Sequence, residues 1–213
     1  SLALAQHAQT TNADVILFCG VHFMSETAKI LNPSKTVIIP DMDAGCSLAD
    51  SAASSEFKTW VKQHPQHTLV SYINCSAEVK AMSDIICTSS NAEKIINSIP
   101  LNQPILFAPD KFLGKFLIKQ TKRDLTLWDG HCQVHVMFSL KELVKLKIRY
   151  PEAKVIAHPE CEEKILSQAN FVGSTTGLIK YTQSTEADQF IVVTEPGVIH
   201  QMQQLNPHKE YLP

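Results

Sequence analysis

An internal repeat is the feature of this sequence that most limits how it can fold. Four pairs of residues share one offset of 86 positions (for the first pair, 158 − 72 = 86): Tyr72 and His158, Cys75 and Cys161, Ser89 and Thr175, Cys46 and Cys132. One offset that recurs without adjustment indicates repeated folding units rather than chance. A third, partial copy begins near Gln189. Within this copy, Leu205-Asn206-Pro207 matches Leu31-Asn32-Pro33.

The repeated unit has the pattern of an α/β protein. Short apolar runs such as 15–18, 68–72, 155–157 and 190–193 are separated by segments with helical spacing. This alternation is typical of parallel sheets covered by helices on both faces. We therefore predict three similar αβα units with short parallel sheets in a pseudo-threefold arrangement around a central site. The expected boundaries are a remnant over 1–14, complete units over 15–100 and 101–186, and a truncated unit over 187–213.

The composition limits the class of partner. The chain has 213 residues, of which 44% are hydrophobic and 19% charged, with a net charge of −2. This balance predicts a globular protein and gives no electrostatic reason to expect nucleic acid or an anionic membrane as a partner. The opening SLALAQHAQT has neither an initiator Met nor the basic region of a signal peptide. We interpret it as the cut end of a longer protein.

Cys46 and Cys132 are the cysteines with the most unusual surroundings. Cys46 lies in DMDAGCSLAD and Cys132 in WDGHCQVH, and each follows a predicted strand and a glycine. Thiolates that converge from three repeated units would suit an iron–sulfur cluster with one iron free of protein ligands. The alternative is that both are unrelated surface thiols.

The other cysteines leave this assignment open. Cys75 and Cys161 also match across the repeat, so symmetry alone does not choose between the two pairs. Cys19 and Cys87 end apolar runs and are expected in the core. With no sign of secretion, we expect reduced thiols rather than disulfides.

Polar residues follow two equivalent strands. Tyr72 and Asn74 in one unit match His158 and Glu160 in the other, and residues two apart at a strand end point to one face. His158 and Glu160 could act as general acid and base, while Tyr72 and Asn74 could orient a polar substrate. Alternatively, His158 is a polar strand cap.

Hydroxyl-rich junctions occur at equivalent places in both units. TSSN (88–91) contains Ser89 and GSTTG (173–177) contains Thr175, each between a predicted strand and a predicted helix. Hydroxyls beside free amides at a helix N-terminus favour a carboxylate or phosphate. Ordinary N-capping explains either segment taken alone.

The motifs DMDAGCSLAD, SYIN, CTSSNA, WDGHCQVH, HPEC and VGSTTG, in this order and spacing, resemble the quinolinate synthase family over essentially the whole chain. The resemblance implies a 4Fe-4S cluster held by one cysteine from each of three domains. Cys46 and Cys132 match two of these ligands, and the third is expected beyond Pro213. It also implies a transferase of NAD biosynthesis that condenses iminoaspartate with dihydroxyacetone phosphate, with L-aspartate oxidase as metabolic partner.

The resemblance also assigns roles at matching positions. Tyr72, His158 and Glu160 would be catalytic, and the substrate-binding set would be Ser1, Tyr72, Asn74, Ser89, His158, Glu160 and Thr175. His135 is a further residue expected near the cavity. The implied compartment is the cytoplasm or a plastid stroma. Since the family's N-terminal histidine and third cysteine are missing here, we expect the chain as given to be inactive.

Two alternatives remain open at this point. The first is another three-cysteine iron–sulfur enzyme, such as hydroxymethylbutenyl diphosphate reductase or a diphthamide-synthesis enzyme, which should not share the YIN, HPE and GSTTG motifs. The second is a non-catalytic α/β protein that binds small anions.

Overall fold

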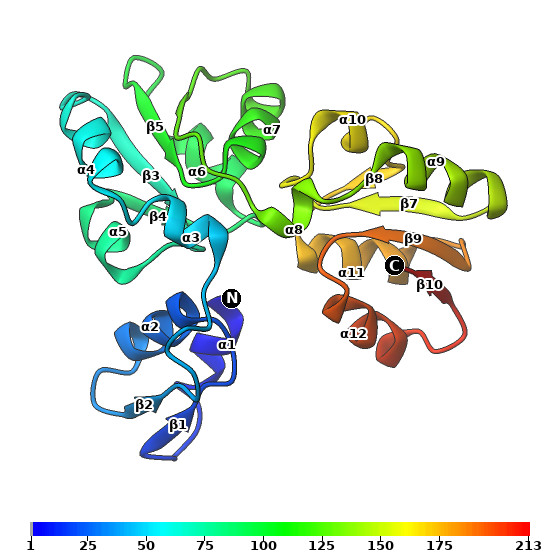
Figure 1. Ribbon diagram of the computed structural model, residues 1–213, viewed down its shortest axis with the longest axis horizontal. Coiled ribbons are helices and arrows are strands. Elements are labelled where there is room, and N and C mark those ends of the chain that lie inside the picture. Colours follow the sequence, from blue (N-terminus) through cyan, green and yellow to red (C-terminus); the bar gives the residue numbers. More distant parts are fainter. Residues whose placement is uncertain (1) are drawn as a thin grey trace.

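Three lobes surround a common centre in the computed structural model, which describes residues 2–213 (Figure 1). The first lobe consists of α1 (Leu2–His7), β1 (Val15–Leu17), α2 (His22–Leu31) and β2 (Thr36–Ile38). The second lobe consists of α3 (Ser47–Ser51), α4 (Ser55–Lys62), β3 (Thr68–Tyr72), α5 (Ala77–Met82), β4 (Ile85–Cys87), α6 (Ala92–Ser98), β5 (Ile105–Ala108), α7 (Lys111–Thr121) and β6 (Thr126–Leu127).

A short helix, α8 (Gln133–Val136), connects the second lobe to the third. The third lobe consists of α9 (Leu140–Arg149), β7 (Lys154–Ala157), α10 (Glu163–Leu166), β8 (Phe171–Val172), α11 (Thr175–Ser184), β9 (Gln189–Val193), α12 (Gly197–Leu205) and β10 (Glu210–Leu212). Within residues 2–213, every helix is too short or too polar to cross a membrane.

The sheets confirm the predicted fold class. All strand pairs are parallel, and the sheet orders are β1-β2 in the first lobe, β4-β3-β5-β6 in the second and β8-β7-β9-β10 in the third. Val70 pairs with Ile85, and Ile156 pairs with Phe171, so the pairing repeats at the sequence offset (156 − 70 = 86 and 171 − 85 = 86). The repeat seen in the sequence is therefore a repeat of sheet topology.

Strand pairing groups the chain differently from the expected boundaries at residues 100 and 186. β5 lies after residue 100 but pairs with β3, and β9 lies after residue 186 but pairs with β7. The segment 187–213 therefore completes the third lobe's sheet instead of starting a new unit. The reason is that an offset fixes the period of a repeat but not the point at which each unit begins.

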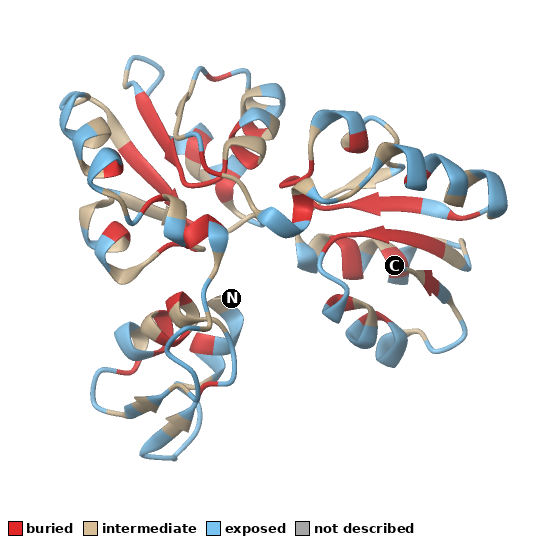
Figure 2. Ribbon diagram, in the orientation of Figure 1, coloured by how far each residue is buried: buried red, intermediate tan, exposed pale blue. Residues whose placement is uncertain are grey.

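Helices cover both faces of the third lobe's sheet. Val155 and Ala157 of β7 pack in one apolar cluster with α9 and α10, whereas Ile156 between them packs in another with α11 and α12. Alternate residues of a strand point to opposite faces, so a continuous apolar run indicates a strand buried on both sides. Figure 2 shows the same arrangement, with buried strands between exposed helices.

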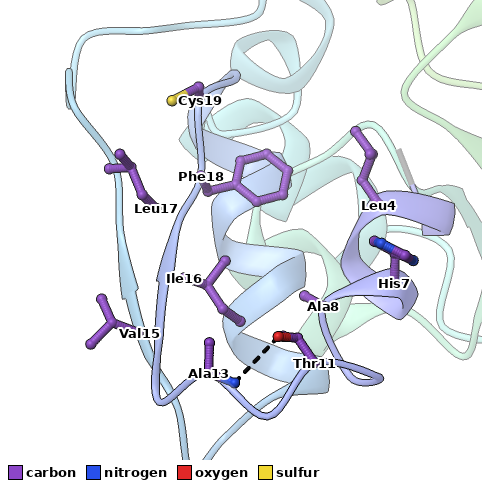
Figure 3. Close-up of a pocket in the computed structure, with 10 residues that line it drawn as sticks. All are labelled: Leu4, His7, Ala8, Thr11, Ala13, Val15, Ile16, Leu17, Phe18 and Cys19. Atoms are coloured by element: carbon purple, nitrogen blue, oxygen red, sulfur yellow. Dashed lines mark hydrogen bonds between the residues drawn. The ribbon is translucent and has the colours of Figure 1, made fainter.

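The first lobe is built differently, because its sheet has two strands and one open face. Ile16 and Phe18 point toward the helices, whereas Val15 and Leu17 point the opposite way (Figure 3). Val15 is 52% exposed and Leu17 is 62% exposed. Cys19 at the end of this run is also exposed, which corrects its expected place in the core, while Cys87 is buried as expected. A strand in a two-stranded sheet buries only the face that a helix covers.

Arg123 is buried and holds the end of α6. Its guanidinium donates to the carbonyl oxygens of Ile99 (2.7 Å) and Pro100 (2.9 Å), with longer contacts to Ile96 and Gln103. Arg123→Met should lower the free energy of unfolding by about 2–4 kcal/mol, because buried carbonyls lose a charged donor. Urea unfolding measures this, with the exposed Arg149→Met as control. Equal effects of the two substitutions would contradict the prediction.

Candidate functional site

A cavity of about 730 Å³ lies at the centre, lined by residues of all three lobes. The residues that the sequence singled out and that line it are Cys46, Tyr72, Asn74, Ser89, Cys132, His135, His158, Glu160 and Thr175. Ser1 lies outside the described residues. The repeat therefore brings residues from distant parts of the sequence to one cavity.

Strand ends place the polar groups. Tyr72 ends β3, and His158 and Glu160 follow the end of β7. The carboxyl ends of parallel strands meet at one edge of a sheet, which is where α/β folds bind ligands. All three side chains are nearly inaccessible, with Glu160 only 2% exposed. A carboxyl group buried this deeply requires polar partners.

Glu160 has such partners on several sides. Its Oε2 lies 3.1 Å from His135 Nδ1, and its Oε1 lies 3.5 Å from His158 Nδ1. The Tyr72 hydroxyl also hydrogen-bonds to Glu160. Glu160 is thus the residue through which the strand-end groups of two lobes meet.

A chain of hydrogen bonds leads from His158 to Glu160. His158 Nε2 lies 3.4 Å from Ser89 Oγ, Ser89 bonds to Tyr72, and Tyr72 bonds to Glu160. The Glu160 amide donates to His158 Nδ1 at 3.4 Å. This assigns the ring proton to Nε2, so that His158 donates to Ser89. All donors in this chain therefore point toward the Glu160 carboxylate.

Burial and local charge set the protonation states. Burial lowers the pKa of His158 to about 4, so its ring is neutral near pH 7. Burial alone would raise the pKa of Glu160, but its contact with His135 and the hydrogen bond from Tyr72 keep that pKa below its usual range. Burial, followed by the nearby Glu160 charge, raises the pKa of Asp110 to about 7. A neutral histidine beside an ionised carboxylate is suited to proton transfer at neutral pH.

Cys46 and Cys132 precede short helices on facing loops. Cys46 stands before α3 and Cys132 before α8, and both thiols are half-buried at the cavity. By contrast, Cys75 and Cys161 are 0% and 1% exposed and lie in apolar clusters. Burial raises the pKa of the Cys132 thiol to about 11. The cavity therefore favours Cys46 and Cys132 as the pair available for ligand binding.

The sulfur environments fit an iron–sulfur cluster. Backbone amides of Leu48 and Ala49 hydrogen-bond to the Cys46 sulfur, and those of Val134 and His135 to the Cys132 sulfur. Such amide contacts stabilise thiolate and tune clusters held by cysteine. A cluster would require two cysteine ligands from this part of the chain, and both thiols already have backbone amides as hydrogen-bond donors.

The two cysteine loops are tied together. The amide of Gln133 donates to Ser47 Oγ at 3.1 Å, and the indole Nε1 of Trp128 donates to the Ser51 carbonyl at 3.2 Å. A methyl group on Gly130 would collide with the Ser51 hydroxyl and a neighbouring backbone oxygen. Glycine is needed here for close approach of the loops.

Asp110, which the sequence interpretation missed, anchors the Cys132 loop. It is fully buried, and its carboxylate accepts from the Leu113 amide at 2.7 Å and from the Cys132 amide at 3.2 Å. It comes shortly after β5, just as Thr194 directly follows β9. Polar residues after buried strands were the available signal for both.

Asp110→Asn should loosen this loop. One side-chain oxygen remains, but the new NH₂ group cannot accept a second amide, so the free energy of unfolding should fall by about 1–3 kcal/mol. Cys132 of metal-free protein should also react faster with an alkylating reagent. Urea unfolding and peptide mapping measure the two effects. Asp129→Asn, at an exposed position on the same loop, is the control, and equal effects there would contradict the assigned anchor.

The hydroxyl-rich junctions behave differently from each other. Ser174 Oγ accepts from the Gly177 amide at 3.2 Å, which is ordinary N-capping of α11. Thr175 is exposed toward the cavity, and Asn91 precedes α6 without capping it. N-capping thus accounts for Ser174, whereas Thr175 and Ser89 are among the junction hydroxyls that line the cavity.

Comparison with known proteins agrees with the site. The family model described as "Quinolinate synthetase A protein" matches residues 1–213. The chain belongs to this family. It is 60% identical to a quinolinate synthase of Trichormus variabilis and 61% identical to one of Nostoc punctiforme, in both cases over 100% of this chain and 66% of the relative. The chain thus spans slightly less than two thirds of the length of these relatives, and the family resemblance of the motifs is confirmed.

Proposed function

We propose that the protein of which this chain is part is a quinolinate synthase that condenses iminoaspartate with dihydroxyacetone phosphate, with loss of phosphate and water. The observation that carries the proposal is the convergence of Cys46 and Cys132 with the Tyr72–Glu160 network on one cavity. The match to the family supports it. In this scheme the enzyme is a transferase of NAD biosynthesis, located in the cytoplasm or a plastid stroma.

The cofactor of this proposal is a 4Fe-4S cluster. Cys46 and Cys132 would supply two of its ligands, and the third would come from a cysteine outside the present chain. When bound, such a cluster supplies a Lewis acid for substrate oxygens. The amide donors around both sulfurs support this assignment.

The chain's own residues would bind substrate and move protons. Asn74 and Thr175 would hold carboxylate or phosphate oxygens at the cavity wall. Glu160 is ionised and could accept a proton from the substrate, while His158, through its Nε2 N–H to Ser89, would hold the Tyr72 hydroxyl toward this carboxylate. Since Tyr72, His158 and Glu160 are buried, water would not compete for the proton. Ser1 would add a further substrate contact in this scheme.

The substrates also imply a neighbouring reaction. Iminoaspartate is the two-electron oxidation product of aspartate, so an L-aspartate oxidase is the expected supplier. A non-catalytic anion-binding protein would need neither the thiols nor a buried Glu160, and no feature of the cavity favours that alternative.

Anaerobic purification of the full-length protein tests the proposal. We expect an iron–sulfur absorption spectrum and formation of quinolinate from both substrates, detected by chromatography and mass spectrometry. Bound cluster without product would contradict the proposed activity. Absence of both after reconstitution with iron and sulfide would contradict the cofactor as well.

A further inference from the structure

We propose that the cluster-free protein binds one divalent transition-metal ion of the zinc type through Cys132, His135 and Glu160, and that this ion competes with the iron–sulfur cluster for Cys132. The ion-binding site stands on its own geometry and goes beyond the proposed function. Only the competition depends on the cluster assigned above. Zinc ligands in proteins are drawn from cysteine, histidine and carboxylate, so the donor set fits.

The donor atoms are already close together. One atom from each of the three side chains lies within 4.8 Å of the other two, and His135 Nδ1 is 3.1 Å from Glu160 Oε2. Tetrahedral zinc with bonds of roughly 2.0–2.3 Å separates its ligand atoms by about 3.5 Å. A movement of these side-chain atoms by about an ångström would therefore bring them to the spacing of zinc ligands. Three protein ligands leave a fourth position for water.

His135 is prepared for a metal by its second nitrogen. The ring is 6% exposed, and its Nε2 lies 3.0 Å from Thr194 Oγ1, which can accept a hydrogen bond from the Nε2 N–H. A cation at Nδ1 would replace the present contact between this atom and Glu160 Oε2, and the ring proton would then lie on Nε2. A metal-bound histidine usually donates its other N–H in this way, which fixes the ring. Thr194 thus holds the orientation of the His135 ring.

Cys132 enters the site on a fixed backbone. Its amide donates to the buried Asp110, and the following residue bonds to Ser47. Cys46 lies next to Ser47 on the opposite loop, and it is not one of the three residues whose donor atoms lie together. The proposal therefore distinguishes a Cys132–His135–Glu160 site from a site made by the two cysteines.

Cobalt titration of the full-length protein tests the site. Protein freed of iron by chelation without oxygen is titrated with Co²⁺, whose thiolate charge-transfer and visible bands report cysteine ligation and tetrahedral geometry. We expect one equivalent to bind and Zn²⁺ to displace it. Cys132→Ser should remove the thiolate band. His135→Ala should weaken binding by about 100-fold or more, and Thr194→Val by about 10-fold.

The control variants are Cys46→Ser and Cys161→Ser, which should keep both the thiolate band and an affinity within about threefold. Loss of the band in Cys46→Ser, or unchanged affinity in His135→Ala, would overturn the proposal. Circular dichroism of each variant checks that it is folded. If His135→Ala does not fold, Thr194→Val decides, because unchanged cobalt affinity in that variant would also overturn the proposed site.

Cluster reconstitution separates the two parts of the inference. Protein loaded with Zn²⁺ should fail to take up iron and sulfide until a chelator is added, whereas zinc-free protein should form a cluster. Equal cluster formation in both samples would overturn the competition. If neither sample forms a cluster while Co²⁺ binds as expected, the proposed cofactor fails and the metal site stands.

Discussion

Cys46→Ala is expected to abolish the iron–sulfur cluster of the full-length protein, whereas Cys75→Ala leaves it intact. Cys46 is half-buried at the cavity, and its sulfur receives hydrogen bonds from the amides of Leu48 and Ala49. Cys75 is fully buried among apolar side chains. Loss of one of three cluster ligands should reduce bound iron and sulfide from near full occupancy to a few per cent. Visible absorption and iron analysis measure the loss.

Cys132→Ser and Cys161→Ala form a second matched pair in the other repeat. Cys132 should behave like Cys46, while Cys161 packs beneath the third lobe's sheet and contacts the Val193 carbonyl. Both alanine controls should cost some stability, because each removes a buried sulfur. Loss of the cluster in the Cys75 and Cys161 variants, with retention in the Cys46 variant, would reverse the ligand assignment.

The sequence was sufficient to predict the fold class, because the apolar runs and the repeat show directly how strands and helices alternate. The offset that joins Tyr72 to His158 also relates β3 to β7, and the side chains at the ends of these two strands line one cavity. Unit boundaries were not predictable in the same way. They depend on which strands pair, and β5 pairs with β3 across the expected boundary at residue 100.

Those parts of the site that depend on long-range contacts could not be predicted from the sequence. The repeat could not choose between the Cys46–Cys132 pair and the Cys75–Cys161 pair, because both share the offset. Burial in the folded chain distinguishes them. Asp110 was missed for a similar reason, since its function depends on an amide 22 positions away in sequence. Contacts of this kind leave no periodic signal.

Glu160→Gln is expected to lower kcat of the full-length enzyme by about 10²–10⁴-fold while leaving cluster content unchanged. The substitution preserves size and one oxygen that can accept from Tyr72, but it removes the charge and the basic site. Glu160 is 2% exposed and lies at the end of the chain of hydrogen bonds that begins at His158. Steady-state formation of quinolinate and iron analysis on the same sample separate the two effects.

Glu163→Gln is the matched control, because Glu163 begins α10 close by in sequence but is exposed and pairs with Lys119 on the surface. It should keep kcat within about twofold, as expected for a surface ion pair of small energetic weight. Normal turnover by the Glu160 variant would exclude the proposed proton transfer. Loss of cluster together with activity would instead assign Glu160 a role in holding the site together, because its contacts with His135 and Tyr72 connect the loop of Cys132 to β3.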